Sequence, residues 1–178
     1  MGKSSSKPYS PSNHFSALVQ RGDIPGLVEF LDKRPYFKQK PVNDNLWSPL
    51  MLACVCEQSE VVRFLVEECK VDVNHEDLDG ETCLHKCAWS GSRKATDIAE
   101  YLCLKGANVS KKSAAGVTPK GIAFIRNSFC EKMLSYYEKH GPWAKHPWHD
   151  WKKLLWLHPK TKYKGLPKSI VKEICNFM

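Results

Sequence analysis

The sequence predicts an all-helical solenoid of about four stacked helix pairs, followed by a further helix pair towards the C-terminus. A hydroxyl residue followed by an apolar stretch recurs at Ser48, Thr82 and Thr118, which are 34 and 36 residues apart. After each stretch come a break and a second segment with apolar residues at helical spacing. A single pair of such helices cannot bury its apolar face, whereas a stack of pairs makes a continuous core.

The repeats are expected to occupy residues 13–141. The first unit lacks a turn motif, which is typical of an N-terminal cap. The third unit carries extra residues in GSRKATD, which predict a longer loop between its two helices. The four units are expected at 13–40, 43–75, 77–110 and 114–141.

Two sets of motifs resemble the two ends of the ankyrin repeat: SPLMLAC, TCLHKCA and VTPKGIA at the start, and KVDVN and KGANV at the end. The resemblance implies a hairpin turn between consecutive units, for which DLDGET supplies the Asp-x-Asp-Gly pattern. It also implies that Thr82 and His85 are structural residues that hydrogen-bond to neighbouring turns. Leu46 stands where the family usually has Gly, and Lys120 and Gly121 replace its Leu-His pair.

The resemblance to ankyrin repeats implies a non-catalytic protein-binding module without a cofactor. In that family, partner contacts come from the hairpin tips and from the exposed side of the first helices. Trp47 and Trp89 are the strongest candidates, because an exposed Trp is a frequent interface anchor; the alternative is that either ring packs against the next repeat. The acids of this face predict a partner with basic or aromatic features. The candidate residues are Asp44, Asn45, Trp47, Leu78, Asp79, Glu81, Trp89 and Ser90.

The net charge of +8 is concentrated near the C-terminus. Residues 1–138 contain 18 Lys and Arg against 17 Asp and Glu, whereas residues 139–178 contain nine Lys and two acids. We expect residues 142–178 to form a basic, Trp-rich helical segment, whose second part resembles an F-box-like or SOCS-box-like tail. That resemblance implies a Skp-type or elongin adaptor and a cullin ubiquitin ligase; the alternative is a structural cap on the last repeat. The implied adaptor-binding residues are Leu166, Pro167, Ile170, Val171 and Ile174.

Residues 1–12 are rich in Ser, Lys and Pro, and are expected to form a disordered tail. Gly2, with Ser6, matches the N-myristoylation pattern, the alternative being an ordinary tail that begins Met-Gly. A single myristoyl chain supports only reversible membrane binding. The sequence has no apolar run of membrane-spanning length and no secretory leader, and its eight cysteines suit a reducing compartment. We therefore expect a cytoplasmic protein, associated with membranes where Gly2 is acylated.

Other function classes find less support in the residues. Lys and Trp interleave after residue 139 and would attract a nucleic acid, but the absence of Arg there argues against base readout. Cys83 and Cys87 flank His85 without a second ligand pair at zinc-finger distance, so no metal site is expected. The stretch HPWHDW lacks a nucleophile motif or a phosphate-binding Gly loop, so no catalytic residue is expected.

Overall fold

The computed structural model describes residues 10–126 and 128–141. All of them belong to one compact unit, Met1–Ala144, and a second unit, Lys145–Met178, lies outside the described residues. The helix pair expected in 142–178 therefore lies outside them too, as does most of the expected N-terminal tail.

Within the described residues all regular structure is helical, which confirms the predicted fold class. The first helix begins at Pro11, two positions inside the tail expected over residues 1–12, because proline's fixed φ and missing N–H suit the first position of a helix. The four pairs are α1 (Pro11–Arg21) with α2 (Ile24–Lys33), α3 (Pro49–Val55) with α4 (Ser59–Glu67), α5 (Cys83–Ser90) with α6 (Arg93–Leu104), and α7 (Pro119–Ile125) with α8 (Cys130–His140); a 3-10 turn, η1 (Pro35–Lys38), follows the first pair.

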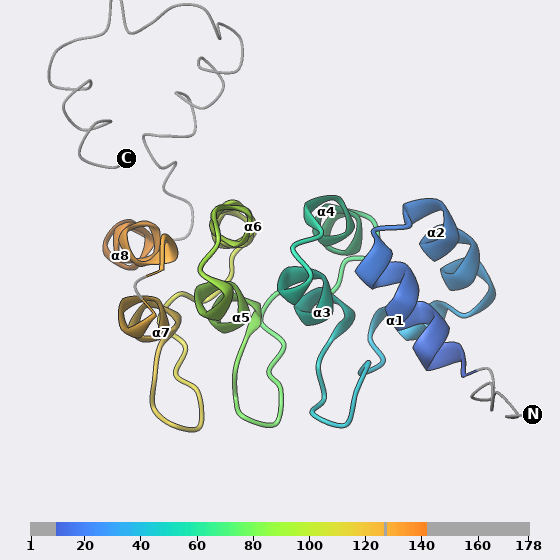
Figure 1. Cartoon of the computed structure of the whole chain (residues 1–178), viewed down its shortest axis with the longest axis horizontal. Coiled ribbons are helices and arrows are strands. Elements are labelled where there is room, and N and C mark those ends of the chain that lie inside the picture. Colours follow the sequence, from blue (N-terminus) through green and yellow to red (C-terminus); the bar gives the residue numbers. More distant parts are fainter. Residues whose placement is uncertain (1–9, 127, 142–178) are drawn as a thin grey trace, which may run out of the picture. The chain divides into compact units, whose positions relative to one another are not determined.

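The helix pairs stack in two rows (Figure 1). The inner row contains α1, α3, α5 and α7, and the outer row contains α2, α4, α6 and α8. Long loops precede α3, α5 and α7, and project from the inner row on the side away from the outer row. The predicted hydroxyls begin these inner helices: Ser48 Oγ accepts the N–H of Met51 at 3.2 Å, and Thr118 Oγ1 accepts the N–H of Gly121 at 3.2 Å. Such N-caps contribute about 1 kcal/mol each.

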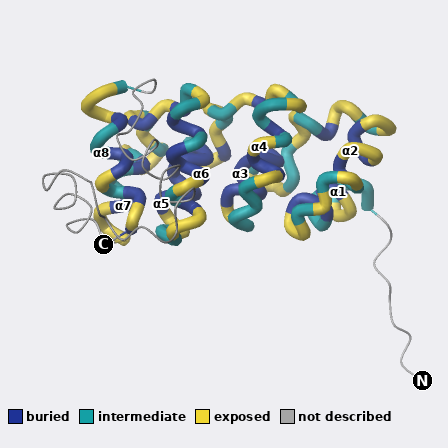
Figure 2. Tube along the Cα trace, turned by 90° about the horizontal axis from the view of Figure 1, so that it is seen from above, coloured by how far each residue is buried: buried dark blue, intermediate teal, exposed yellow. Residues whose placement is uncertain are grey.

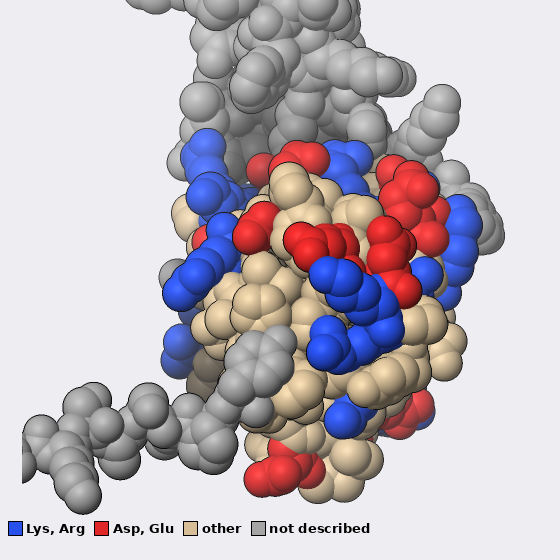
Figure 3. Space-filling view, turned by 90° about the vertical axis from the view of Figure 1, so that its right-hand side faces the viewer, with Lys and Arg blue, Asp and Glu red and all other residues tan. Residues whose placement is uncertain are grey.

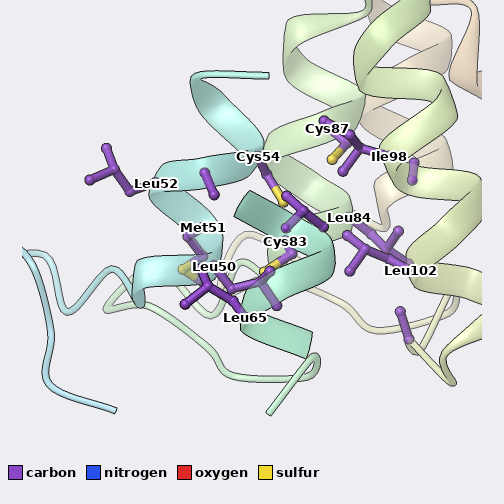
Figure 4. Packing of buried hydrophobic residues seen from close by; sticks show 14 of the residues in the cluster. Leu50, Met51, Leu52, Cys54, Leu65, Cys83, Leu84, Cys87, Ile98 and Leu102 are labelled. Atoms are coloured by element: carbon purple, nitrogen blue, oxygen red, sulfur yellow. The ribbon is translucent and has the colours of Figure 1, made fainter. Parts of the chain in front are cut away.

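The apolar core is shared by helices of both rows, and its buried segments recur along the stack (Figure 2). Val61, Val62 and Leu65 of α4 and Leu102 of α6 are fully buried. They pack with residues of the inner row, among them Leu50 and Leu84 (Figure 4). Full burial of one such side chain stabilises the fold by roughly 1.5–3 kcal/mol, so each pair depends on its neighbours for most of its stability.

The loop between α5 and α6 consists of residues 91–92, although the sequence predicted a longer loop in this unit. That prediction was wrong, because the additional residues extend the helix: α6 has 12 residues, whereas α4 has nine. The loop ends at Ser92, because its Oγ accepts the N–H of Ala95 at 3.0 Å and so caps the start of α6.

Polar side chains join consecutive repeats at their ends. Asn74, in the motif KVDVN, accepts the N–H of Asn108 at 2.8 Å and donates to the carbonyl of Gly106 at 3.2 Å. Gln58 likewise donates to the carbonyl of Gln20 at 2.7 Å, which ties the first unit to the second. The repeat period therefore places each motif opposite the same motif of its neighbour.

The N-terminal end of the stack, formed by α1 and α2, presents charges of both signs side by side (Figure 3). Glu29 and Lys33 form an exposed ion pair of 2.6 Å there, one helical turn apart. A polar outer face of this kind suits a capping repeat, and the capping role of this unit stays a prediction. Among the described helices, none combines the length and the apolar character that crossing a membrane requires.

Candidate protein-binding surface

The hairpin tips before α5 and α7 are built by backbone hydrogen bonds, both within each tip and to the preceding tip. The N–H of Leu78 donates to the carbonyl of Asn45 at 3.1 Å, and the N–H of Ala114 donates to the carbonyl of Asp79 at 2.8 Å. These bonds bring Asp44, Asn45, Leu78 and Asp79 together along one edge of the stack. All four are exposed, so this part of the predicted set forms one surface, which we name the tip edge.

A buried charged network centred on Lys86 lies beneath the hairpin tip that precedes α5. Its ammonium is 2.6 Å from Asp77 Oδ2 and 2.6 Å from Glu81 Oε2, and it lies 4.7 Å from the centre of the Trp47 ring. Oδ1 of Asp77 accepts the N–H groups of Asp79 and Glu81. Glu81 and Trp47, both predicted to contact a partner, are therefore already engaged inside the molecule.

The network fixes the ionisation of its members. Burial alone would raise the pKa of Asp77, but the Lys86 ammonium and the two backbone N–H groups outweigh it and hold the pKa below its usual value. Burial would likewise lower the pKa of Lys86, and hydrogen bonds to Asp77 and Glu81 raise it instead. Both side chains are thus charged at neutral pH, and they support the tip from within.

Thr82 and His85 have the structural roles that the resemblance implied. The Nδ1 atom of His85 accepts the N–H of Thr82 at 3.0 Å, and its Nε2 atom lies 3.1 Å from the carbonyl oxygen of Val117 in the next tip. Nδ1 must be unprotonated to accept, so Nε2 carries the hydrogen and donates it. The buried ring therefore caps α5 and attaches the following repeat.

At the other end of the inner helices, three apolar side chains occupy equivalent positions in consecutive repeats. Val55, Trp89 and Ile125 each follow the capping hydroxyl of their unit by seven residues, and they are 40%, 60% and 74% exposed. The preceding residues Cys54 and Ala88 are 0% exposed. In α3 and α5 the helical turn thus directs one residue into the core and the next to solvent, whereas in α7 the preceding residue, Phe124, is 74% exposed as well. The result is a row of exposed apolar groups across α3, α5 and α7.

Two arginines lie on exposed rings next to this row. The guanidinium carbon of Arg126 is 4.5 Å from the centre of the Trp89 ring, and that of Arg93 is 5.7 Å from the centre of the Phe129 ring. Phe129 is exposed as well. We name the apolar row with these groups the aromatic–basic patch; it comprises Val55, Arg93, Trp89, Ile125, Arg126 and Phe129.

The predicted binding residues therefore separate into different places. Trp89 and Ser90 end α5, whereas the tip edge precedes its start, and an eight-residue helix is about 12 Å long. Sequence reasoning missed Val55, Ile125 and the two arginines of the patch. The signal that would have found the first two is their constant distance from the capping hydroxyl.

The CLHKC motif is part of the core. Cys83 and Cys87 are buried with Cys54, and the neighbouring thiols and burial together raise the pKa of Cys54 (Figure 4). A protonated, buried thiol is a poor nucleophile and a poor metal ligand. Within the described residues no group of three His, Cys, Asp or Glu side chains is arranged to hold a metal ion.

The remaining predicted site residues lie outside the described residues. These are the candidate lipidation site Gly2 and the adaptor-binding set Leu166, Pro167, Ile170, Val171 and Ile174.

Comparisons with known proteins agree with this architecture. A family model described as "Ankyrin repeats (3 copies)" matches residues 15–113, more than half of the chain. Alpha-latrocrustotoxin-Lt1a of Latrodectus tredecimguttatus is 36% identical over 75 residues, which are 42% of this chain and 5% of the toxin. Ankyrin repeat and SAM domain-containing protein 6 of Rattus norvegicus is 32% identical over 114 residues, 64% of this chain and 12% of that protein. The chain thus matches only a small part of each relative. It belongs to the ankyrin-repeat family, whose repeats form a protein-interaction module and are generally not enzymes.

Proposed function

We propose that this protein recruits another protein by binding it on the inner row of its repeats. The single observation that carries the proposal is the exposed apolar row of Val55, Trp89 and Ile125 at equivalent positions of three consecutive repeats. An isolated exposed apolar residue needs no explanation, but a row continued across three helices is typical of an interaction surface.

Trp89 is the anchor of this proposed surface. A Trp side chain buries a large apolar area and is enriched among the residues that dominate binding energy. The Arg126 guanidinium on the ring restricts its orientation, so less conformational freedom is lost when a partner covers it. The tip edge would supply polar contacts at the rim.

A photo-cross-linking amino acid at position 89 of the full chain tests the proposal in cells. We expect specific cross-linked proteins, reduced when Val55 and Ile125 are changed to Ser. The same cross-linker at Val28, an exposed apolar position on the outer helix α2, is the matched control. Equal products at both positions, or none at position 89, would contradict binding on the inner row.

A finer proposal concerns the C-terminal segment, in which Leu166-Pro167 is followed by apolar residues at helical spacing. We propose that this segment binds a Skp-type or elongin adaptor, so that the protein serves as a substrate receptor of a cullin ubiquitin ligase. Affinity purification of the full chain and of a chain ending at Gly141 tests it. Recovery of an adaptor and a cullin with the full chain alone supports the proposal; recovery of neither with the full chain contradicts it.

A last proposal concerns location. We propose a cytoplasmic protein that associates reversibly with membranes through a myristoyl group on Gly2, supported by the match of Gly2 and Ser6 to the acylation pattern. Metabolic labelling with a myristate analogue should mark the native chain and leave the variant Gly2→Ala unmarked. Equal labelling of the two, or no labelling of either, contradicts the proposal.

A further inference from the structure

The chemistry of the aromatic–basic patch narrows the class of partner. Its cations, Arg93 and Arg126, lie on aromatic rings. A guanidinium stacked on a ring keeps its N–H donors in its own plane, where they remain directed outward and match the two oxygens of a carboxylate. With guanidinium carbons 4.5 Å and 5.7 Å from the ring centres, Arg126 and Arg93 each place carboxylate-binding N–H groups beside an apolar ring.

One acid at this end of α5, Glu57, is held by serine hydroxyls. The carboxylate of Glu57 accepts the hydroxyl of Ser90 at 2.7 Å. Hydrogen bonds from the Ser92 and Ser90 hydroxyls hold the pKa of Glu57 below its ordinary value, with Lys94 adding a smaller attraction. Glu57 thus stays ionised and is held by these hydroxyls, so the feature of the patch that favours an anionic partner is its two arginines, whereas the exposed acids Asp44 and Asp79 lie at the tip edge.

Two other occupants fit less well. Residues 142–178 carry eight Lys and two acids, so this segment has the same sign of charge as the patch. A nucleic acid would stack bases on free ring faces, but here a guanidinium takes up one face of each ring, and the row continues with the aliphatic side chains of Val55 and Ile125. Aliphatic groups suit the side chains of a peptide better than they suit bases.

We propose that the aromatic–basic patch binds an acidic peptide segment, in which Asp or Glu carboxylates pair with Arg93 and Arg126 while interleaved apolar side chains cover Val55, Trp89 and Ile125. The proposal rests on the inner row being a protein-binding surface, and it revises the partner expected from the sequence. The acids at the tip edge pointed to a basic partner, whereas Trp89, the principal anchor, lies among cations.

The test is the binding of two short fluorescein-labelled peptides to the full chain, measured by fluorescence anisotropy at low and high salt. One peptide interleaves Glu with Leu and Phe, and the other has Lys in place of each Glu. We expect the Glu peptide to bind more tightly, and to weaken as salt screens the ion pairs. The double variant Arg93→Gln, Arg126→Gln should weaken binding about tenfold or more, since charge-assisted pairs are being removed.

The matched control is the double variant Arg63→Gln, Lys105→Gln. These two cations also lie on a ring, that of Tyr101, but on the outer helix α4 and at the end of α6. This variant removes the same amount of charge and should leave the affinity for the Glu peptide unchanged. Circular dichroism checks that both double variants fold.

Equal binding of the Lys and Glu peptides, equal loss in the two double variants, or preferential binding of a single-stranded RNA probe at the patch would each overturn the proposal. Cross-linking at position 89 is a separate measurement. Specific cross-links without preference for the Glu peptide would leave the inner row as a binding surface and reject only the acidic partner.

Discussion

The second and third repeats make the same three left-handed turns but use different residues for them. At three equivalent turns the third repeat has Gly80, Gly91 and Gly106, all with positive φ, and the second has Leu46, Glu57 and Lys70 at φ of 59°, 54° and 54°. A side chain in this left-handed region costs roughly 1–2 kcal/mol. Stacking against the neighbouring units therefore imposes the turn geometry, even where the local residue disfavours it.

The same two repeats differ in polarity beneath their tips. Lys86 of the third repeat occupies the position of Leu52 in the second, and Asp77 that of Asn43. Asn43 Oδ1 accepts the N–H of Trp47 at 3.0 Å, as Asp77 Oδ1 accepts that of Glu81 at 2.9 Å. The neutral amide of Asn43 thus accepts the same backbone N–H of the turn without a buried ion pair. Substitutions that exchange these residues between the repeats test what the ion pair contributes to stability.

The largest effect is expected from Lys86→Leu, which copies the second repeat at one position only. It leaves the Asp77 carboxylate buried without its cation and should lower the free energy of unfolding by about 3 kcal/mol. The double variant Asp77→Asn, Lys86→Leu copies both positions and should recover most of that loss. Urea unfolding at neutral pH measures both, and a double variant no more stable than the single one would show that the charge on Asp77 is not the cause.

The next effect is expected from Gly80→Ala. A Cβ there would lie 3.1 Å from the backbone nitrogen of Ala114, in addition to the strain of φ +67°, so we expect a loss of about 2 kcal/mol. Gly116→Ala is the control, since its φ is +77° but no atom lies within 4 Å of the added Cβ; about 1 kcal/mol is expected. Equal losses of unfolding free energy in the two variants would mean that the close approach of Gly80 to the next tip does not affect stability.

A pH dependence should come from the third repeat, because His85 stands where the second repeat has Met51. Burial lowers the pKa of His85 below 6.5, although the hydrogen bond to Val117 opposes this. Below pH 6.5 the unfolded chain therefore binds a proton that the folded chain resists, and stability present above pH 6.5 is lost as the pH falls. Met51 has no such group to titrate.

The variant His85→Met tests that sign. At pH 7.5 it should be less stable by about 1–2 kcal/mol, because the carbonyl of Val117 loses its donor, and its stability should fall less between pH 7.5 and 5.5 than that of the native chain. The native chain, unfolded at the same two pH values, is the reference for this variant. Urea unfolding at the two pH values measures both, and an unchanged slope in His85→Met would exclude His85 as the source.

The smallest effects are expected where the second repeat is made to resemble the third. Leu46→Gly should raise the free energy of unfolding by about 0.5–1 kcal/mol, because it relieves a left-handed side chain at the cost of a more flexible unfolded state. Glu57→Gly should change the free energy of unfolding little, because the removed left-handed strain is offset by the loss of the hydrogen bond from Ser90. Thermal unfolding compares the stability of the two variants. An equal increase in both would mean that the Ser90–Glu57 hydrogen bond does not stabilise the fold.

The local sequence predicted the repeats and their register correctly because the signals that begin a helix act over three residues. Thr82 and Thr118 mark helix starts, and His85 completes a cap, through contacts to backbone N–H groups within the same turn. Leu46 was recognised at a glycine position, and its φ of 59° agrees. The prediction for the α5–α6 loop was wrong, because added residues can extend a helix as readily as a loop, and the cap at Ser92 decides which.

Helical periodicity and local capping, both visible in the sequence, are enough to predict the solenoid, the order of its helix pairs and the residues that face its core. Which of Trp47 and Trp89 is available to a partner depends instead on how the repeats stack. Trp47 lies against Lys86 of the next repeat, whereas Trp89 is covered on one face by Arg126 and is otherwise exposed. Exposure depends on side chains more than thirty positions away, and a local pattern contains no information about what those neighbours cover.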